Sequence, residues 1–156
     1  EDTEKLKGLT PLTNDQLKDW LPESLDGMAR TGFVVGKTGY MNVASIEGTF
    51  KSEDGRKFEI NVIDGAGETG SILMTGMGMA SNMDMEQEDE NKHVRTVTVN
   101  GIKAQQTYHK KREDTDIQFV YNDRFGVMVT GKDLQPEKTW ELIDKINLGK
   151  LNDLTD

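Results

Sequence analysis

Apolar and polar residues alternate along the chain in three places, and each alternation is interrupted by residues that favour tight turns. The first alternation begins at Tyr40, breaks at the Asp-Gly pair of positions 54–55 and resumes over 58–62. The second runs from Val94 to Val99 and breaks at the Asn-Gly pair of positions 100–101, the strongest two-residue signal for a hairpin. A period of two indicates strands with one buried face, so both stretches predict β-hairpins.

A third hairpin is predicted from Ile117 to Val129, with its turn at Asn122 and Asp123. Six strands joined as three hairpins indicate a largely antiparallel six-stranded sheet. The residues expected on its buried face alternate with polar neighbours and are Ala44, Ile46, Gly48, Phe50, Phe58, Ile60, Val62, Ala104, Gln106, Tyr108, Phe119, Tyr121, Phe125 and Val127.

A capping box predicts the first helix. The Thr13 hydroxyl can accept from the Gln16 amide while the Gln16 side chain returns to Thr13, which satisfies two amides at a helix start. The helix presents Leu17 and Trp20 on one face and has to end before Pro22.

Two later stretches change from a period of two to helical spacing. Within positions 71–83 the apolar residues recur every three to four residues, although two glycines weaken the helix. Positions 134–147 carry Pro136 in the first turn, where its missing N–H is harmless, and place Trp140 and Ile143 near one stripe. We expect a middle helix and a C-terminal helix whose Trp140 is buried.

An antiparallel sheet with N-terminal, middle and C-terminal helices is an α+β fold in which the helices cover at least one face of the sheet. A chain of 156 residues has the length of a single domain, 1–156. We expect residues 1–11, which precede the first strong helix signal, to form a flexible N-terminal segment.

The charge of the chain argues against nucleic acid as a partner. Its 19 basic and 28 acidic residues give a net charge of −9, which repels a phosphate backbone. The one basic cluster, at 109–112, falls where a strand ends, and we interpret it as a solvated strand end beside nearby acids.

Few residues of the chain could perform catalysis. There is no cysteine, which excludes thiol catalysis and zinc thiolate sites, and the two histidines, His93 and His109, are both predicted to face solvent from strands. No apolar run is long enough to span a membrane. The polar stretch that begins at Glu1 is typical of an exported protein, or of a lipoprotein with a lipid anchor, from which the leader has been left out. We therefore expect a periplasmic or cell-envelope location in a Gram-negative bacterium.

Gly65, Gly67 and Gly70 match the G-x-G-x-x-G pattern of dinucleotide-binding turns. The strand before them alternates with polar residues, whereas the first strand of such a domain is buried on both faces, so we expect a glycine turn that binds no dinucleotide and no other cofactor. A helix N-terminus at this turn could still hold an anion or a developing negative charge. Asp64 and Glu68 beside it are therefore the candidate carboxylates of an alternative, enzymatic function.

Five of the eight methionines lie between Met74 and Met85, and thioethers are soft ligands for Cu(I). Met77, Met79 and Met83 are the candidate ligands of an alternative copper site. Helical spacing spreads the cluster over different faces, so we favour core filling instead. We expect Met74 and Met77 to pack under the sheet, no bound metal, and a partly exposed stretch around Met83.

The pattern from Asn100 and Gly101 through Asn122 to Phe125, followed by the Trp140 helix, resembles exported proteins of Bacteroidetes-type bacteria. The order of hairpins and end helices is also similar to that of the photosystem accessory protein PsbP and the nuclear transport factor Mog1. This resemblance implies a noncatalytic cell-envelope domain. Because the chain has few groups that could perform catalysis, we expect it to bind a protein or a small ligand, through a sheet face or the glycine turn.

Overall fold

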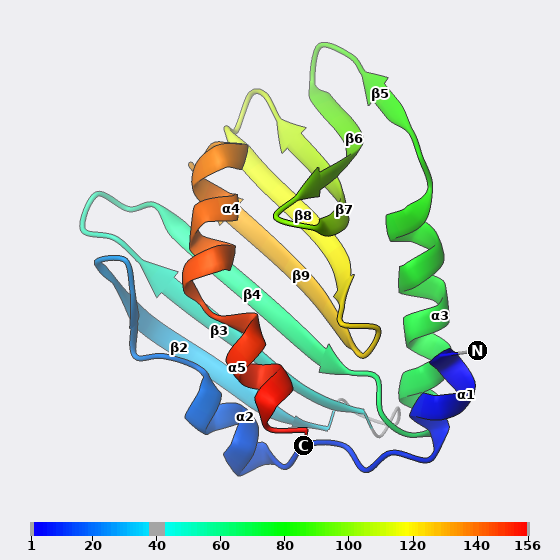
Figure 1. The fold of residues 1–156 in the computed structure, drawn as a ribbon. Coiled ribbons are helices and arrows are strands. Elements are labelled where there is room, and N and C mark those ends of the chain that lie inside the picture. The colour runs from blue at the N-terminus through cyan, green and yellow to red at the C-terminus, as the bar shows by residue number, and fades with distance from the viewer. Residues whose placement is uncertain (1, 38–42, 156) are drawn as a thin grey trace.

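Residues 2–37 and 43–155, described by a computed structural model, form five helices and nine strands (Figure 1). The helices are α1 (Asp2–Lys7), α2 (Asn14–Trp20), α3 (Glu68–Asn82), α4 (Pro136–Lys145) and α5 (Leu148–Asp153). The strands are β1 (Ser24–Leu25), β2 (Met28–Lys37), β3 (Ala44–Lys51), β4 (Lys57–Asp64), β5 (Glu86–Glu88), β6 (Lys92–Val99), β7 (Ile102–His109), β8 (Asp114–Tyr121) and β9 (Phe125–Lys132). Glu1 and Tyr40, which figured in the sequence analysis, lie outside the described residues.

All nine strands belong to one open sheet with the order β1-β2-β3-β4-β9-β8-β7-β6-β5, and every neighbouring pair is antiparallel. The α+β class and the three predicted hairpins, β3-β4, β6-β7 and β8-β9, are confirmed. Pairing of β4 with β9 joins the first hairpin to the other two.

The predicted number of six strands is wrong, because β1, β2 and β5 lack the alternation that marks a half-buried strand. In β2, Phe33, Val34 and Val35 are consecutive apolar residues between two glycines. Strand β5 has only exposed polar residues, and β1 is two residues long. These strands lie at or next to the sheet edges and are held mainly by pairing, with Leu25 and Met28 as their contacts to the core.

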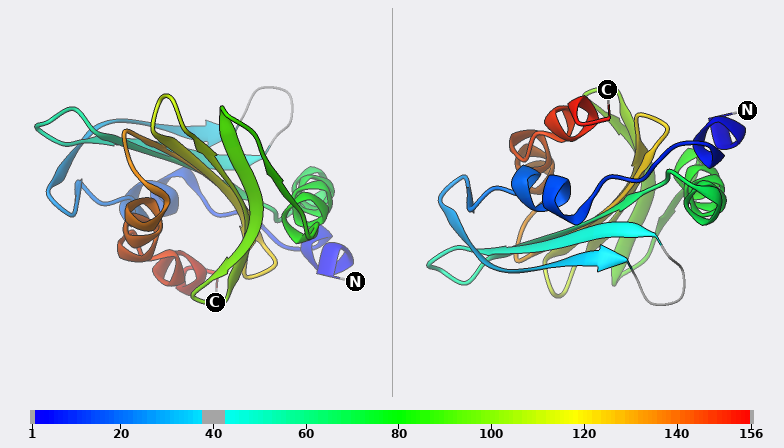
Figure 2. Two further views of the ribbon diagram at one scale, coloured as in Figure 1. Left: turned by 90° about the horizontal axis from the view of Figure 1, so that it is seen from above. Right: turned by 90° about the horizontal axis from the view of Figure 1, so that it is seen from below.

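The sheet is bent, and helices lie on both of its faces (Figure 2). Helices α2, α4 and α5 fill the concave face, whereas α3 lies on the convex face with α1 beside it. The glycines of β9 mark the two faces, since a Cβ at Gly131 would meet Thr139 of α4 and one at Gly126 would meet Met77 of α3. The large hydrophobic cluster contains residues of α2, α4 and α5, so the main core lies on the concave side.

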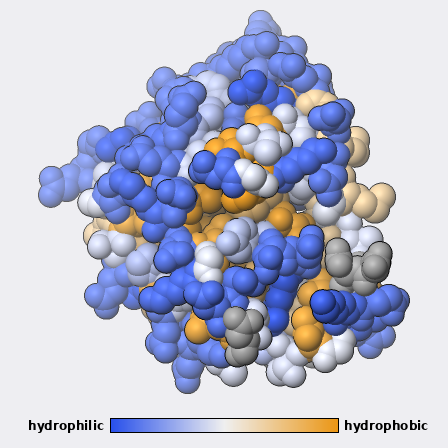
Figure 3. Space-filling model, viewed as in Figure 1, coloured by the Kyte–Doolittle hydropathy of each residue, from blue (hydrophilic) through white to orange (hydrophobic). Residues whose placement is uncertain are grey.

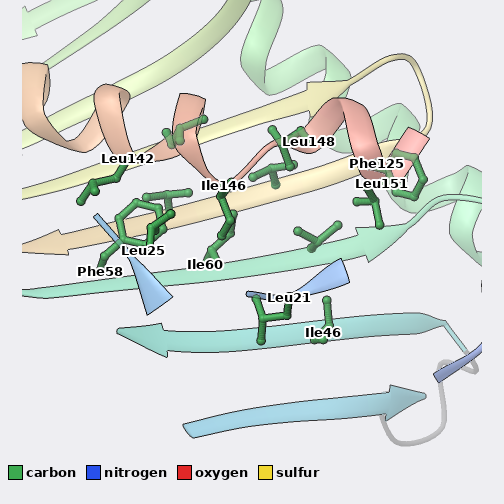
Figure 4. Packing of buried hydrophobic residues seen from close by; sticks show 14 of the residues in the cluster. Leu21, Leu25, Ile46, Phe58, Ile60, Phe125, Leu142, Ile146, Leu148 and Leu151 are labelled. Carbon is green, nitrogen blue, oxygen red and sulfur yellow. The ribbon is translucent and has the colours of Figure 1, made fainter. Parts of the chain in front are cut away.

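That core is built from the inward-facing strand positions that the alternation predicted, covered by the helices (Figure 4). Phe58 and Ile60 of β4 lie in the same cluster as Leu142 of α4 and Leu151 of α5. Burial of each large apolar side chain contributes about 1.5–3 kcal/mol, so this layer supplies most of the driving force for the fold.

Helix α2 begins with the predicted capping box. The Thr13 side chain accepts from the Gln16 N–H at 3.1 Å, and the Gln16 side chain accepts from the Thr13 N–H at 2.9 Å. At the other end, the Trp20 Nε1 donates to the Asn147 carbonyl at 3.0 Å. This bond ties α2 to the junction of α4 and α5, where Asn147 adopts a left-handed conformation.

The helix bounds differ from the predicted ones in two places. Helix α3 covers Glu68–Asn82 and so begins at the glycine turn itself. The predicted helix over 134–147 is divided into α4 and α5 because Asn147, with φ of 62°, breaks the α-helical path. The segment 1–11, for which the sequence predicts flexibility, contains α1, whose Leu6 is buried.

Candidate functional site

A cleft of about 680 Å³ opens on the concave side between α4 and β6. Figure 3 shows apolar surface near the middle of this face, framed by hydrophilic residues. We call it the Trp140 cleft, and its lining residues are Arg95, Thr96, Val97, Thr98, Val99, Asn100, Gln106, Pro136, Glu137, Trp140, Glu141 and Asp144.

Trp140 is held rigidly beside the cleft. Its Nε1 donates a hydrogen bond of 2.8 Å to the Gln106 side chain, and its ring stacks on Phe119 with centroids 5.9 Å apart and planes at 24°. Gln106 is itself buried, so this bond satisfies two polar groups away from solvent. The indole is therefore fixed in place with its polar edge satisfied, and only 7% of Trp140 is exposed.

The apolar wall opposite α4 is made of β6 side chains that the helices leave partly uncovered. Val97 and Val99 pair with Ala104 and Ile102 of β7 and are only partly buried against the core. A second hollow of about 320 Å³ shares Asn100, Trp140 and Asp144 with the cleft and continues toward Leu148 of α5. The apolar surface thus extends along α4 beyond one side chain.

Three carboxylates form a row on the α4 side of the cleft. Glu137, Glu141 and Asp144 stand at i, i+4 and i+7, the spacing that places residues on one side of a helix. Glu141 is paired with Lys138 at 3.6 Å and Lys145 at 3.4 Å, and all three carboxylates are exposed. The cleft therefore combines an apolar interior with an acidic rim.

The position of α4 is secured by ion pairs to the β1-β2 turn. Asp26 accepts from Lys138 at 2.6 Å and from Lys145 at 2.8 Å. The hydrogen bond from Lys138, and then that from Lys145, lowers the pKa of Asp26 to about 2. The hydrogen bond to Asp26 also raises the pKa of Lys145 above its ordinary value.

Asp64, the candidate carboxylate beside the glycine turn, is a buried structural group. It is 1% exposed and forms an ion pair with Arg124, in which Nε lies 2.8 Å and Nη2 lies 3.0 Å from its oxygens. The backbone amides of Leu12 and Ala66 also donate to it, at 2.8 and 3.0 Å. The oxygens of Asp64 are therefore already occupied by donors of the chain itself. The neighbouring candidate Glu68 is exposed.

The three glycines of the turn are packing positions. The Gly67 N–H donates to the Leu6 carbonyl at 2.8 Å, so this amide is not available to bind an anion. A Cβ at Gly65 would lie 2.4 Å from the Arg124 carbonyl, and a Cβ at Gly70 would lie 2.7 Å from the backbone of Gly65. Close backbone approach therefore explains Gly65 and Gly70, and the φ of 96° explains Gly67.

The candidate copper ligands do not face one point. Met77 would touch a Cβ at Gly126 under the sheet, whereas Met79 is 70% and Met83 is 60% exposed. Met74 is buried, as expected, and Met85 accepts a weak hydrogen bond from Gln105 at 3.8 Å. Among the described residues no group of three or more histidines or carboxylates could hold a metal ion.

The two histidines lie on different faces of the sheet. His93 pairs with Tyr108, so these two side chains share one face, and His109, the next residue of β7, lies on the other face. His93 contacts Glu86 at 2.7 Å, and His109 contacts Asp116 at 2.8 Å. They cannot share a site. The basic strand end after His109 forms ion pairs with acids, as in Lys110 with Glu88 at 2.8 Å.

The Trp140 cleft is not predictable from the sequence pattern. The expected burial of Trp140 is correct for the ring, but the alternation along β6 gives no sign that its valines lack a covering helix. One signal was available, namely the i, i+4, i+7 row of Glu137, Glu141 and Asp144 on the helix that carries Trp140.

Comparison with known proteins adds little to these observations. No protein-family model matches the chain, and no curated protein is detectably similar to it. A GTP-binding regulator from Thermotoga maritima has a TM-score of 0.40 and 12% sequence identity, over 86% of this chain and 84% of its own. Within the described residues, no helix has the length and apolar character needed to cross a membrane.

Proposed function

We propose that this chain is a noncatalytic binding module that holds a small ligand with an apolar body and a positive charge in the Trp140 cleft. The observation that carries the proposal is a cleft of about 680 Å³ that has Val97, Val99 and Trp140 in its lining and lies beside a row of three carboxylates on α4. Binding sites for small ligands are mostly apolar concavities with a few polar groups that fix orientation.

The electrostatics favour a cation as the charged part of the ligand. Glu137, Glu141 and Asp144 line one side of the cleft, and the chain as a whole carries a net charge of −9. Arg95 also lines the cleft, but a concave site in which one sign of charge predominates concentrates ligands of the opposite sign. Trp140 also lines the cleft, where the 7% of its surface that is exposed adds a small aromatic contact.

The arrangement of the carboxylates supports binding rather than hydrolysis. The three carboxylates share one side of the cleft, whereas the two carboxylates of a glycoside hydrolase flank the scissile bond on opposite sides. The carboxylate-based alternative at Asp64 loses its support, because that side chain is occupied by Arg124 and two backbone amides. The cell-envelope location stays a prediction from the sequence, which fractionation of the producing cells would test.

A titration of the intact protein with 2-phenylethylammonium tests the proposal, followed through the Trp140 indole N–H resonance in NMR spectra. The neutral 2-phenylethanol and the anionic 3-phenylpropionate serve as ligands of similar shape. A fragment of this size is expected to bind at roughly millimolar concentration. We expect the cation to bind most tightly and the anion most weakly.

Paired variants separate the rim from the overall charge. The double variant Glu137→Gln, Asp144→Asn should weaken binding of the cation several-fold and leave the alcohol unaffected. The double variant Glu53→Gln, Glu68→Gln removes the same charge at exposed positions away from the cleft and should change little. No saturable shift of the Trp140 resonance with any of the three compounds would refute the proposal.

A further inference from the structure

Strand β2 forms an open edge of the sheet. Its partner on one side is β3, from Ala29 to Lys37 with a bulge between Arg30 and Gly32, but on the other side β1 pairs only with Met28 and Ala29. Over Thr31 to Gly36, among the residues that the structure describes, one side of the strand has no neighbouring strand. Such an edge presents backbone N–H and C=O groups to any other strand.

The side chains of this segment do not protect the edge. Val34 is 70% and Phe33 is 43% exposed, and no residue from Thr31 to Gly36 is charged. Charged residues, proline, bulges and very short strands are the usual means of blocking edge pairing, and the bulge of β2 lies before Gly32. The opposite edge has them, because β5 consists of only Glu86, Gln87 and Glu88, all exposed.

We propose that the β2 edge pairs with a second copy of this chain, antiparallel and about a two-fold axis at Val34. The axis places Val34 against Val34 of the partner subunit on the convex face. It places Phe33 against Val35 of the partner subunit on the concave face, twice. These faces follow from the pairing of Phe33 with Gly48 and of Val35 with Ile46 in β3.

Both kinds of contact are favourable across paired strands. Aromatic residues opposite β-branched residues stabilise antiparallel pairs, and so do pairs of β-branched residues. The same register places Gly32 against Gly36 of the partner subunit, so no bulky side chain is left without a matching one. An isologous interface needs a surface that is complementary to itself, and the segment centred on Val34 meets this requirement.

Charge and area determine how strong the dimer is. The paired segment is uncharged and brings no like charges into register, but each copy carries −9 overall, so salt should strengthen the association. The register pairs five residues of each copy, Gly32–Gly36, and this edge covers less than the roughly 800 Å² per partner of a stable complex. The dimer is therefore weak and forms only at high protein concentration.

Sedimentation equilibrium of the intact chain over a range of protein concentrations, at low and at moderate salt, tests the proposal. The mass should rise toward that of a dimer with concentration, and more so with salt. Val34→Lys places two like charges opposite each other on the axis and should lower the association constant roughly tenfold or more. Ile72→Lys is the matched control, since Ile72 is an apolar α3 residue of 63% exposure away from β2.

Amide hydrogen exchange of the unmodified chain gives an independent measurement. Exchange within Thr31–Gly36 should slow as protein concentration rises, while exchange in β5 should not change. A chain that stays monomeric at every concentration would overturn the proposal. So would a dimer that Val34→Lys leaves intact, or one that Ile72→Lys weakens equally.

Discussion

Arg124, in the turn between β8 and β9, holds Asp64 at the end of β4 through two hydrogen bonds of 2.8 and 3.0 Å, although 60 residues separate them in the chain. The same guanidinium donates to the Thr10 carbonyl at 3.2 Å, and the Leu12 amide donates to Asp64. One buried ion pair therefore joins the N-terminal segment, the glycine turn and the central hairpin.

Asp64→Asn should lower the free energy of unfolding by about 3–5 kcal/mol, because it leaves the buried Arg124 charge without its partner. Urea denaturation followed by circular dichroism measures this loss. Glu68→Gln, four residues along and exposed, is the control and should change stability by less than about 0.5 kcal/mol. An Asp64→Asn protein of unchanged stability would contradict a structural role for this carboxylate.

Trp140→Ala should lower the free energy of unfolding by about 3–5 kcal/mol, since it removes a large buried ring that stacks on Phe119. Trp140→Phe keeps an aromatic ring but leaves the buried Gln106 side chain without its donor, which costs about 1–3 kcal/mol. Thermal and chemical unfolding of the two variants should rank them in that order. If the Ala variant lost less than about 1 kcal/mol, α4 would be only loosely attached to the sheet.

Two glycines of α3 should respond in opposite ways to alanine. At Gly76 a Cβ meets no atom within 4 Å, so Gly76→Ala should stabilise the helix by about 0.5–1 kcal/mol. At Gly70 a Cβ would lie 2.7 Å from the backbone of Gly65, so Gly70→Ala should destabilise the protein. Unfolding midpoints of the two variants give the comparison, and equal shifts would show that the turn can open to admit a side chain.

The ion pairs of Asp26 should make stability depend on pH in the acid range. Its pKa is about 2 in the folded protein and 3.8 ordinarily, so the unfolded chain binds a proton more readily between these values. The contribution is fully present above the ordinary pKa and is lost as pH falls through about 2. The difference in urea midpoint between the unmodified chain and Asp26→Asn should therefore shrink from pH 5 to pH 2.

Asp153→Asn is the control for that experiment, because Asp153 is exposed at the end of α5. Its urea midpoint should follow that of the unmodified chain across the same pH range. A constant difference for Asp26→Asn down to pH 2 would mean that Lys138 and Lys145 do not hold Asp26 in solution.

Local chemistry in the sequence determined the parts of the fold that depend on neighbours in the chain. The Thr13 and Gln16 capping box starts α2, and the Asn100-Gly101 pair turns between β6 and β7 with both residues at positive φ. Alternation identified the buried residues of β3, β4, β8 and β9, because one face of each strand packs on helices. These signals span a few residues, and no tertiary contact overrides them.

Tertiary structure alone decided the two edges and the candidate site. Strand β2 has no alternation to detect, since it is held by β3 on one side and reaches solvent on the other. In the sequence Asp64 is a candidate catalytic carboxylate, and only the fold shows that it is paired with Arg124. The Trp140 cleft exists because the helices on the concave face leave Val97 and Val99 of β6 partly uncovered, and how far helices cover a curved sheet is a property of no single segment.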